Sequence, residues 1–82
     1  MERQLKDKQL RTLRFIYDYI KSNDFAPKRK EIAEALGISL GAVNYRIYYL
    51  LDYGYLRESQ PSELGRGIAL TEKGIWACKG DE

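Results

Sequence analysis

Only three residues, Gly37 to Ser39, separate two helical patterns in this chain of 82 residues, and this short connection restricts the fold most. The first pattern, "KRKEIAEAL" from Lys28, repeats its apolar residues at helical spacing. Gly37 can adopt the left-handed backbone that ends a helix, and Ser39 is a good N-cap for the next one. Two helices joined so closely must pack against each other, as in a helix-turn-helix unit.

The second helical pattern, Leu40 to Tyr53, has two chemically different faces. Val43, Ile47 and Leu50 form an apolar stripe that is expected to face the core. The opposite face is predicted to hold Leu40, Gly41, Asn44, Tyr45 and Tyr48. An asparagine can bond an adenine edge through two hydrogen bonds, and tyrosine phenols reach phosphate oxygens. We therefore predict a nucleic-acid-reading helix, with Arg46 a quarter-turn away and able to serve a phosphate.

The remaining patterns complete one α+β domain over residues 1–82. We expect helices over residues 7–22, 28–36 and 40–53, a two-stranded hairpin over 55–71, and a short helix over 72–79. The hairpin is indicated by two strand-like runs joined by "PSELGR". This predicts a three-helix bundle with a β-hairpin.

Composition excludes several classes of function. The chain has no histidine and one cysteine, Cys78, so it has neither a disulfide framework nor a histidine-based metal or nucleophile site. It also lacks a glycine-rich phosphate loop. We therefore expect no enzyme, no cofactor and no metal. No signal peptide or membrane-length apolar run is visible, so no membrane association and a cytoplasmic, nucleoid-associated location are expected.

Charge is distributed unevenly along the chain. Residues 1–30 hold nine Lys or Arg against four Asp or Glu, whereas residues 31–82 hold five against eight. A basic segment of this kind suits contact with a polyanion, although a solvated charged helix gives the same pattern.

Most of the chain, from Leu5 to about Leu70, resembles the N-terminal DNA-binding domain of LexA-type repressors. The resemblance is carried by "KQLRTLRFIYDYI", "FAPKRKEIAEALGIS", "GAVNYRIYYLLDYGYL" and "GRGIAL". It implies a winged helix-turn-helix fold and a double-stranded DNA partner. The base-facing residues that it implies are Ser39, Gly41, Ala42, Asn44 and Tyr45. Backbone or wing contacts are expected from Lys28, Arg29, Arg46, Tyr48, Arg66 and Gly67.

The chain departs from LexA-type repressors after the wing. It has no room for their self-cleaving protease domain, so we expect a stand-alone regulator, and "LTEKG" followed by "IWACK" is more similar to small archaeal, phage or MarR-like winged-helix regulators. The residues of the helix from Leu40 to Tyr53 differ from those usual in the family. The operator sequence that the family binds therefore cannot be assigned to this chain. No small-molecule effector is evident.

The expected function is sequence-specific binding of double-stranded DNA by a transcriptional repressor, and two other functions remain open at the level of sequence. The chain could be a protein-interaction winged helix in a larger assembly. Asn44 and Tyr48 also match the reader helix of Z-DNA-binding winged helices, although the Pro-Pro-x-Trp wing of that family is absent. Finally, we expect a homodimer with Trp76 at the contact, whereas the same residue could pack on the first helix beside Ile16 and Ile20.

Overall fold

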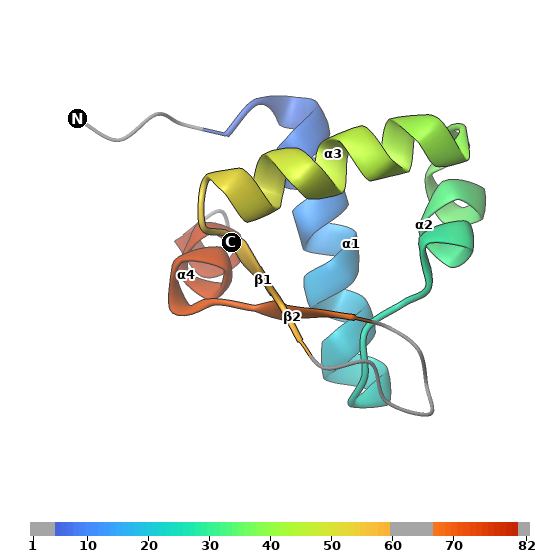
Figure 1. Cartoon of the computed structure of the whole chain (residues 1–82). Coiled ribbons are helices and arrows are strands. Elements are labelled where there is room, and N and C mark those ends of the chain that lie inside the picture. Colours follow the sequence, from blue (N-terminus) through green and yellow to red (C-terminus); the bar gives the residue numbers. More distant parts are fainter. Residues whose placement is uncertain (1–4, 60–66, 81–82) are drawn as a thin grey trace.

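The computed structural model describes residues 5–59 and 67–80, which form four helices and one antiparallel pair of strands. In chain order the elements are α1 (Asp7–Asn23), α2 (Arg29–Leu36), α3 (Leu40–Asp52), β1 (Leu56–Glu58), β2 (Ile68–Leu70) and α4 (Glu72–Gly80). Figure 1 shows α3 crossing the upper part of α1, with α2 beside one end of α3 and α4 near the other. The predicted α+β class, a helical bundle with a two-stranded hairpin, is confirmed.

Local backbone geometry sets the helix ends within one residue of the expected positions. α1 continues to Asn23, because Asp24 adopts a left-handed conformation at φ +65° and donates its N–H to Ile20 at 2.8 Å. α2 begins after Lys28, whose extended backbone N–H donates to the Glu31 carboxylate at 2.7 Å. α3 ends one residue early, at position 52, and α4 ends one residue late, at position 80.

The core draws side chains from every element. The stripe expected on α3 is fully buried, as are residues of α1, α2, α4 and β1, and Ile68 of β2 is buried to 6% exposure. Members of this core include Leu13, Ile16, Ile32, Val43, Ile47, Leu50, Leu56, Ile68 and Cys78. Burial of a single large aliphatic side chain contributes roughly 1.5–3 kcal/mol. The core therefore fixes which face of α3 remains at the surface.

The turn between α2 and α3 has the chemistry that the sequence predicts. Gly37 is left-handed at φ +67°, and Ile38 donates its N–H to the carbonyl of Ala33 at 3.0 Å. The hydroxyl oxygen of Ser39 accepts the N–H of Ala42 at 3.1 Å and caps α3. These bonds satisfy backbone groups that helix ends otherwise leave without partners.

α4 is tied to the hairpin by Thr71. Its hydroxyl donates to the carbonyl of Gly54 at 2.6 Å and accepts the N–H of Gly74 at 3.0 Å. Gly74 is buried so closely against the hairpin that a Cβ there would overlap the carbonyl oxygen of Tyr55. The approach of α4 to β1 therefore requires glycine at position 74.

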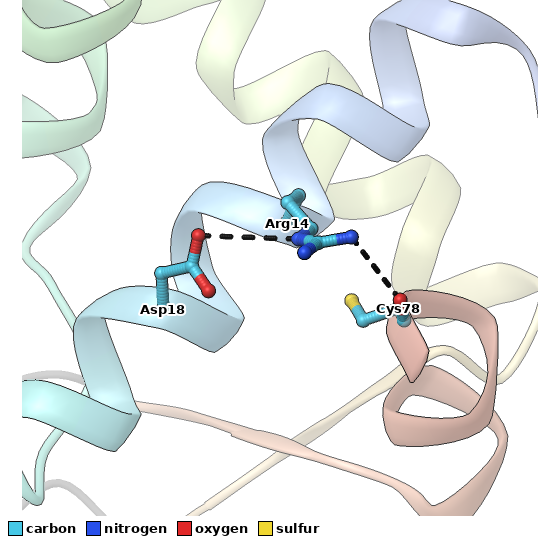
Figure 2. A network of polar contacts seen from close by, with 3 residues as sticks. All are labelled: Arg14, Asp18 and Cys78. Carbon is cyan, nitrogen blue, oxygen red and sulfur yellow. Dashed lines mark hydrogen bonds and ion pairs between the residues drawn. The ribbon is translucent and has the colours of Figure 1, made fainter. Parts of the chain in front are cut away.

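A second connection joins α4 to α1. Figure 2 shows the guanidinium of Arg14, on α1, donating to the carbonyl oxygen of Cys78 at 3.2 Å and lying 3.9 Å from the carboxylate of Asp18. The Cys78 side chain is fully buried.

None of the helices in the described residues has the length and apolar character needed to cross a bilayer.

Trp76 lies on α4 and is 72% exposed. The alternative in which it packs on α1 beside Ile16 and Ile20 is therefore wrong. The buried side of α4 is formed instead by Gly74 and Cys78, which lie two residues to either side of Trp76. On a helix, residues two positions apart point in different directions, which turns the indole outward.

We expect Gly74→Ala to lower the free energy of unfolding by about 1–3 kcal/mol, the usual cost of overpacking. Urea denaturation measures the change. Lys79→Ala, an exposed position on the same helix, is the matched control and should change stability by less than about 0.5 kcal/mol. Equal stability of Gly74→Ala and wild type would show that α4 moves without cost.

Candidate nucleic-acid interface

One side of α3 presents large side chains to solvent. Leu40 is 51% exposed, Tyr45 66% and Tyr48 59%, although the opposite stripe of the same helix is fully buried. Together with exposed Gly41, these residues form what we call the exposed face of α3. Single exposed apolar residues are common on proteins, but a helix face built from several of them indicates a surface that meets a partner.

The beginning of α3 is open to an anion. Ser39 uses its hydroxyl oxygen as an acceptor for the N–H of Ala42, and its hydroxyl proton stays available to a partner. Other amides in a first helical turn have no carbonyl partner within the helix, and the helix dipole favours negative charge there. Both residues lie at this end of α3, where Ser39 is exposed and Ala42 is half-buried.

The surroundings of Gly41 give no reason why the fold needs a glycine at this position. Its φ is not in the left-handed region, and a Cβ built there meets only the Ser39 hydroxyl oxygen, at 3.9 Å. Glycine within a helix costs about 0.5–1 kcal/mol relative to alanine. A glycine that the fold does not need is consistent with a partner that approaches the backbone of α3 closely.

The predicted outward position of Asn44 implied a free side chain on the exposed face of α3. The structure instead places Asn44 half-buried against α2. Its Oδ1 accepts a 2.7 Å hydrogen bond from Nη1 of Arg29, the first residue of α2. The same guanidinium lies 5.7 Å from the ring centre of Tyr48. We call these three side chains the Arg29–Asn44–Tyr48 cluster. All three residues were predicted site residues, but the contacts of Arg29 with the other two were not predicted.

Arg46 is directed toward α1. Its Nη1 donates to the Thr12 hydroxyl at 3.2 Å, and that hydroxyl donates to the carbonyl of Lys8 at 2.9 Å. Beside it lies a hollow of about 180 Å³ between α1 and the α2–α3 turn. The hollow is lined by Asp7, Lys8, Arg11, Leu36, Ile38 and Arg46. Arg46 therefore joins the basic side of α1 and does not share the exposed face of α3.

The remaining predicted residues lie at the edges of this surface. Lys28 is exposed at the start of α2. Gly67 is left-handed at φ +71°, and its carbonyl accepts the N–H of Ser59 at 3.0 Å, so its described role is to close the hairpin. The predicted wing contact Arg66 lies outside the described residues.

Arg57, which is exposed on β1, was not among the predicted site residues. It lines a surface hollow of about 430 Å³ between the end of α3 and the hairpin, together with Tyr48, Leu51, Asp52, Leu56 and Glu58. Strand alternation could have indicated that Arg57 points away from the core, since its neighbour Leu56 is buried. The acidic residues beside it make this end of α3 less suited to a polyanion than the first turn.

The described residues contain no cluster of three or more His, Cys, Asp or Glu side chains that could hold a metal ion. The groups that this surface presents are hydrogen-bond donors, phenols and a guanidinium group. These groups suit recognition of base edges and phosphates.

Comparison with known proteins identifies related chains. The family model described as LexA DNA binding domain matches residues 2–63. LexA repressors of Leuconostoc citreum (strain KM20) and Leuconostoc mesenteroides subsp. mesenteroides are each 32% identical, over 73 and 71 residues, or 88% and 85% of this chain. The chain spans only 35% and 34% of their lengths.

A solved structure shares the fold. Lactococcus lactis ZitR, in the form of a cysteine-to-serine mutant, matches with a TM-score of 0.74 and 23% sequence identity. The match covers 99% of this chain and 53% of that chain. It extends the structural similarity through α4, beyond residue 63, where the family match ends.

We expect Gly41→Ala to raise the free energy of unfolding by about 0.5–1 kcal/mol, because the fold supplies space for the methyl group and alanine favours the helix. Urea denaturation tests this. A loss of stability would show that the fold itself needs glycine at the start of α3.

Proposed function

This chain belongs to the family of LexA DNA-binding domains, and we propose that it binds double-stranded DNA at specific sequences and represses transcription. The exposed face of α3 carries this proposal, because it places aromatic side chains and an open helix N-terminus on one surface. The name LexA repressor, which both Leuconostoc relatives carry, supports repression as the outcome of binding.

We assign base reading to the first half of α3, namely to Ser39, Gly41, Ala42, Asn44 and Tyr45. Insertion of a helix N-terminus into the major groove brings such residues to base edges. We assign backbone contacts to Lys28 and Tyr48, which are both exposed. We assign Arg46 to a phosphate contact from the α1 side, away from the exposed face of α3, and the wing at Arg66 and Gly67 to the flanking backbone or minor groove.

A homodimer forms the second part of the proposal. One winged helix reads only a short half-site, and two copies double the base contacts. Trp76 supports an interface on α4, since it is 72% exposed and lies between the half-buried residues Ile75 and Ala77. Indole rings bury large apolar area at interfaces.

Selection of bound sequences from a random pool of double-stranded DNA tests the function. We expect one enriched motif, and an inverted repeat with half-sites about 10 base pairs apart if two copies bind. Affinity for the motif should fall as salt concentration rises, because phosphate contacts release counterions. A pool that stays random at low salt would favour the protein-interaction alternative.

We expect Asn44→Ala to lose about 1–3 kcal/mol of specific binding and to relax preference at one base position. Titration of the selected site measures the loss, with Lys79→Ala on α4 as a control of unchanged affinity. Unchanged affinity and motif in Asn44→Ala would remove Asn44 from the base-reading residues.

Gly41→Ala should bind the same site more weakly although the fold is more stable.

Trp76→Ala should dissociate the dimer and leave the helical circular dichroism signal intact, because the side chain is exposed within one chain. Sedimentation velocity at micromolar concentration compares the variant with the wild type, and Lys79→Ala is the control on the same helix. A monomeric wild type would contradict the proposed dimer in the absence of DNA.

A further inference from the structure

We propose that Arg29 restricts what Asn44 can recognise, so that this pair selects a guanine and rejects an adenine. The inference rests on the proposed function and names the base class that one reader residue takes. It corrects the simplest expectation for an asparagine on a reader helix, which is a pair of hydrogen bonds to adenine. Arg29 acts here as a positioning residue for Asn44.

The hydrogen bond fixes the orientation of the Asn44 amide. Arginine carries only donors, so the group that faces it at 2.7 Å must be the amide oxygen and not the amide nitrogen. The Nδ2 amino group then lies on the other side of the planar amide, away from Arg29. Asn44 has no other hydrogen-bond partner within the described residues, and this amino group remains available for a ligand.

Arg29 is itself held in place. Its guanidinium lies over the ring of Tyr48, 5.7 Å from the ring centre, and its backbone opens α2. Within the described residues it forms no ion pair, so no carboxylate competes with Asn44 for it. A half-buried guanidinium with a single acceptor still has N–H donors to offer.

Base-edge chemistry then decides which base fits. Adenine presents the N7 acceptor and the N6 amino donor, and the donor needs an acceptor such as the Asn44 oxygen. That oxygen already accepts a hydrogen bond from Arg29 and keeps one further lone pair, but the guanidinium 2.7 Å away disfavours a second donor beside it. Guanine presents two acceptors, N7 and O6, to the major groove. The donors of Asn44 and Arg29 therefore match guanine, while adenine brings its N6 amino donor close to the guanidinium.

Two other arrangements compete with this inference. The Arg29–Asn44 hydrogen bond could break on DNA, which would send Arg29 to a phosphate and free Asn44 to read adenine. Alternatively, the bond could serve only to hold α2 against α3. Both arrangements predict that base preference at the Asn44 position does not depend on Arg29.

The first experiment uses the wild-type protein. The base position at which Asn44→Ala relaxes preference identifies the contact, and we expect guanine there in the selected motif. Replacing that guanine by 7-deazaguanine, which lacks the N7 acceptor, should weaken binding about tenfold. Inosine in the same place should bind like guanine, because it differs only in the minor groove.

The outcomes separate this inference from the proposed function. A random pool without any motif would overturn sequence-specific binding itself. A clear motif with adenine at the Asn44 position, or an unchanged affinity with 7-deazaguanine, would overturn the inference and leave the proposed function standing.

The second experiment compares Arg29→Met with Lys30→Met. The methionine at position 29 keeps an apolar side chain beside Tyr48 but frees the Asn44 oxygen, so the preference for guanine over adenine should fall about tenfold. Lys30 is exposed on the same turn, and its variant should keep the wild-type preference. An equal loss of affinity for both bases in Arg29→Met would indicate a phosphate contact and overturn the proposal.

Discussion

The left-handed backbone at Gly37 sets the relation between α2 and α3 on which the candidate interface depends. At φ +67° it ends α2 and lets the chain turn within three residues into a helix capped by Ser39. A side chain with a Cβ rarely adopts this conformation, so the short turn depends on glycine. Because the turn is short, Arg29 and Asn44 come within hydrogen-bonding distance although 15 positions separate them. The polar chemistry of the surface is thus a consequence of one backbone conformation.

The elements themselves could be predicted from the sequence, because each depends on local information. Apolar periodicity indicated the buried stripe of α3, and the glycine and serine indicated the ends of two helices. The side-chain contacts between helices could not be predicted in this way. Arg29 and Asn44 meet through the packing of α2 against α3, and the hydrogen bond from Arg46 to the buried Thr12 likewise depends on the packing of α3 against α1. Such polar contacts leave no periodic trace in a sequence.

The sequence was also ambiguous about Trp76. Large apolar residues near the end of a small domain fit either a core or an interface, and composition does not separate the two. The structure excludes the core position through Gly74, since a glycine that lets α4 approach Tyr55 also determines which side of α4 is buried. The indole then faces solvent on the opposite side. The orientation of Trp76 is thus set by the close packing of Gly74 and not by the tryptophan itself.

The charge distribution is consistent with the proposed contact between the exposed face of α3 and a polyanion. The basic residues gather on α1 and at the start of α2, whereas Asp52 and Glu58 lie beside the far end of α3 and the hairpin. A net charge of only +2 gives weak long-range attraction, so orientation comes from this asymmetry and from the helix dipole. The first turn of α3 is therefore the end of the helix that favours contact with a phosphate backbone. At that end the side chains proposed to read bases are mostly neutral, which would leave discrimination between bases to the direction of individual hydrogen bonds. A guanidinium that holds one amide in a single orientation therefore has more influence on specificity here than it would among many charged contacts.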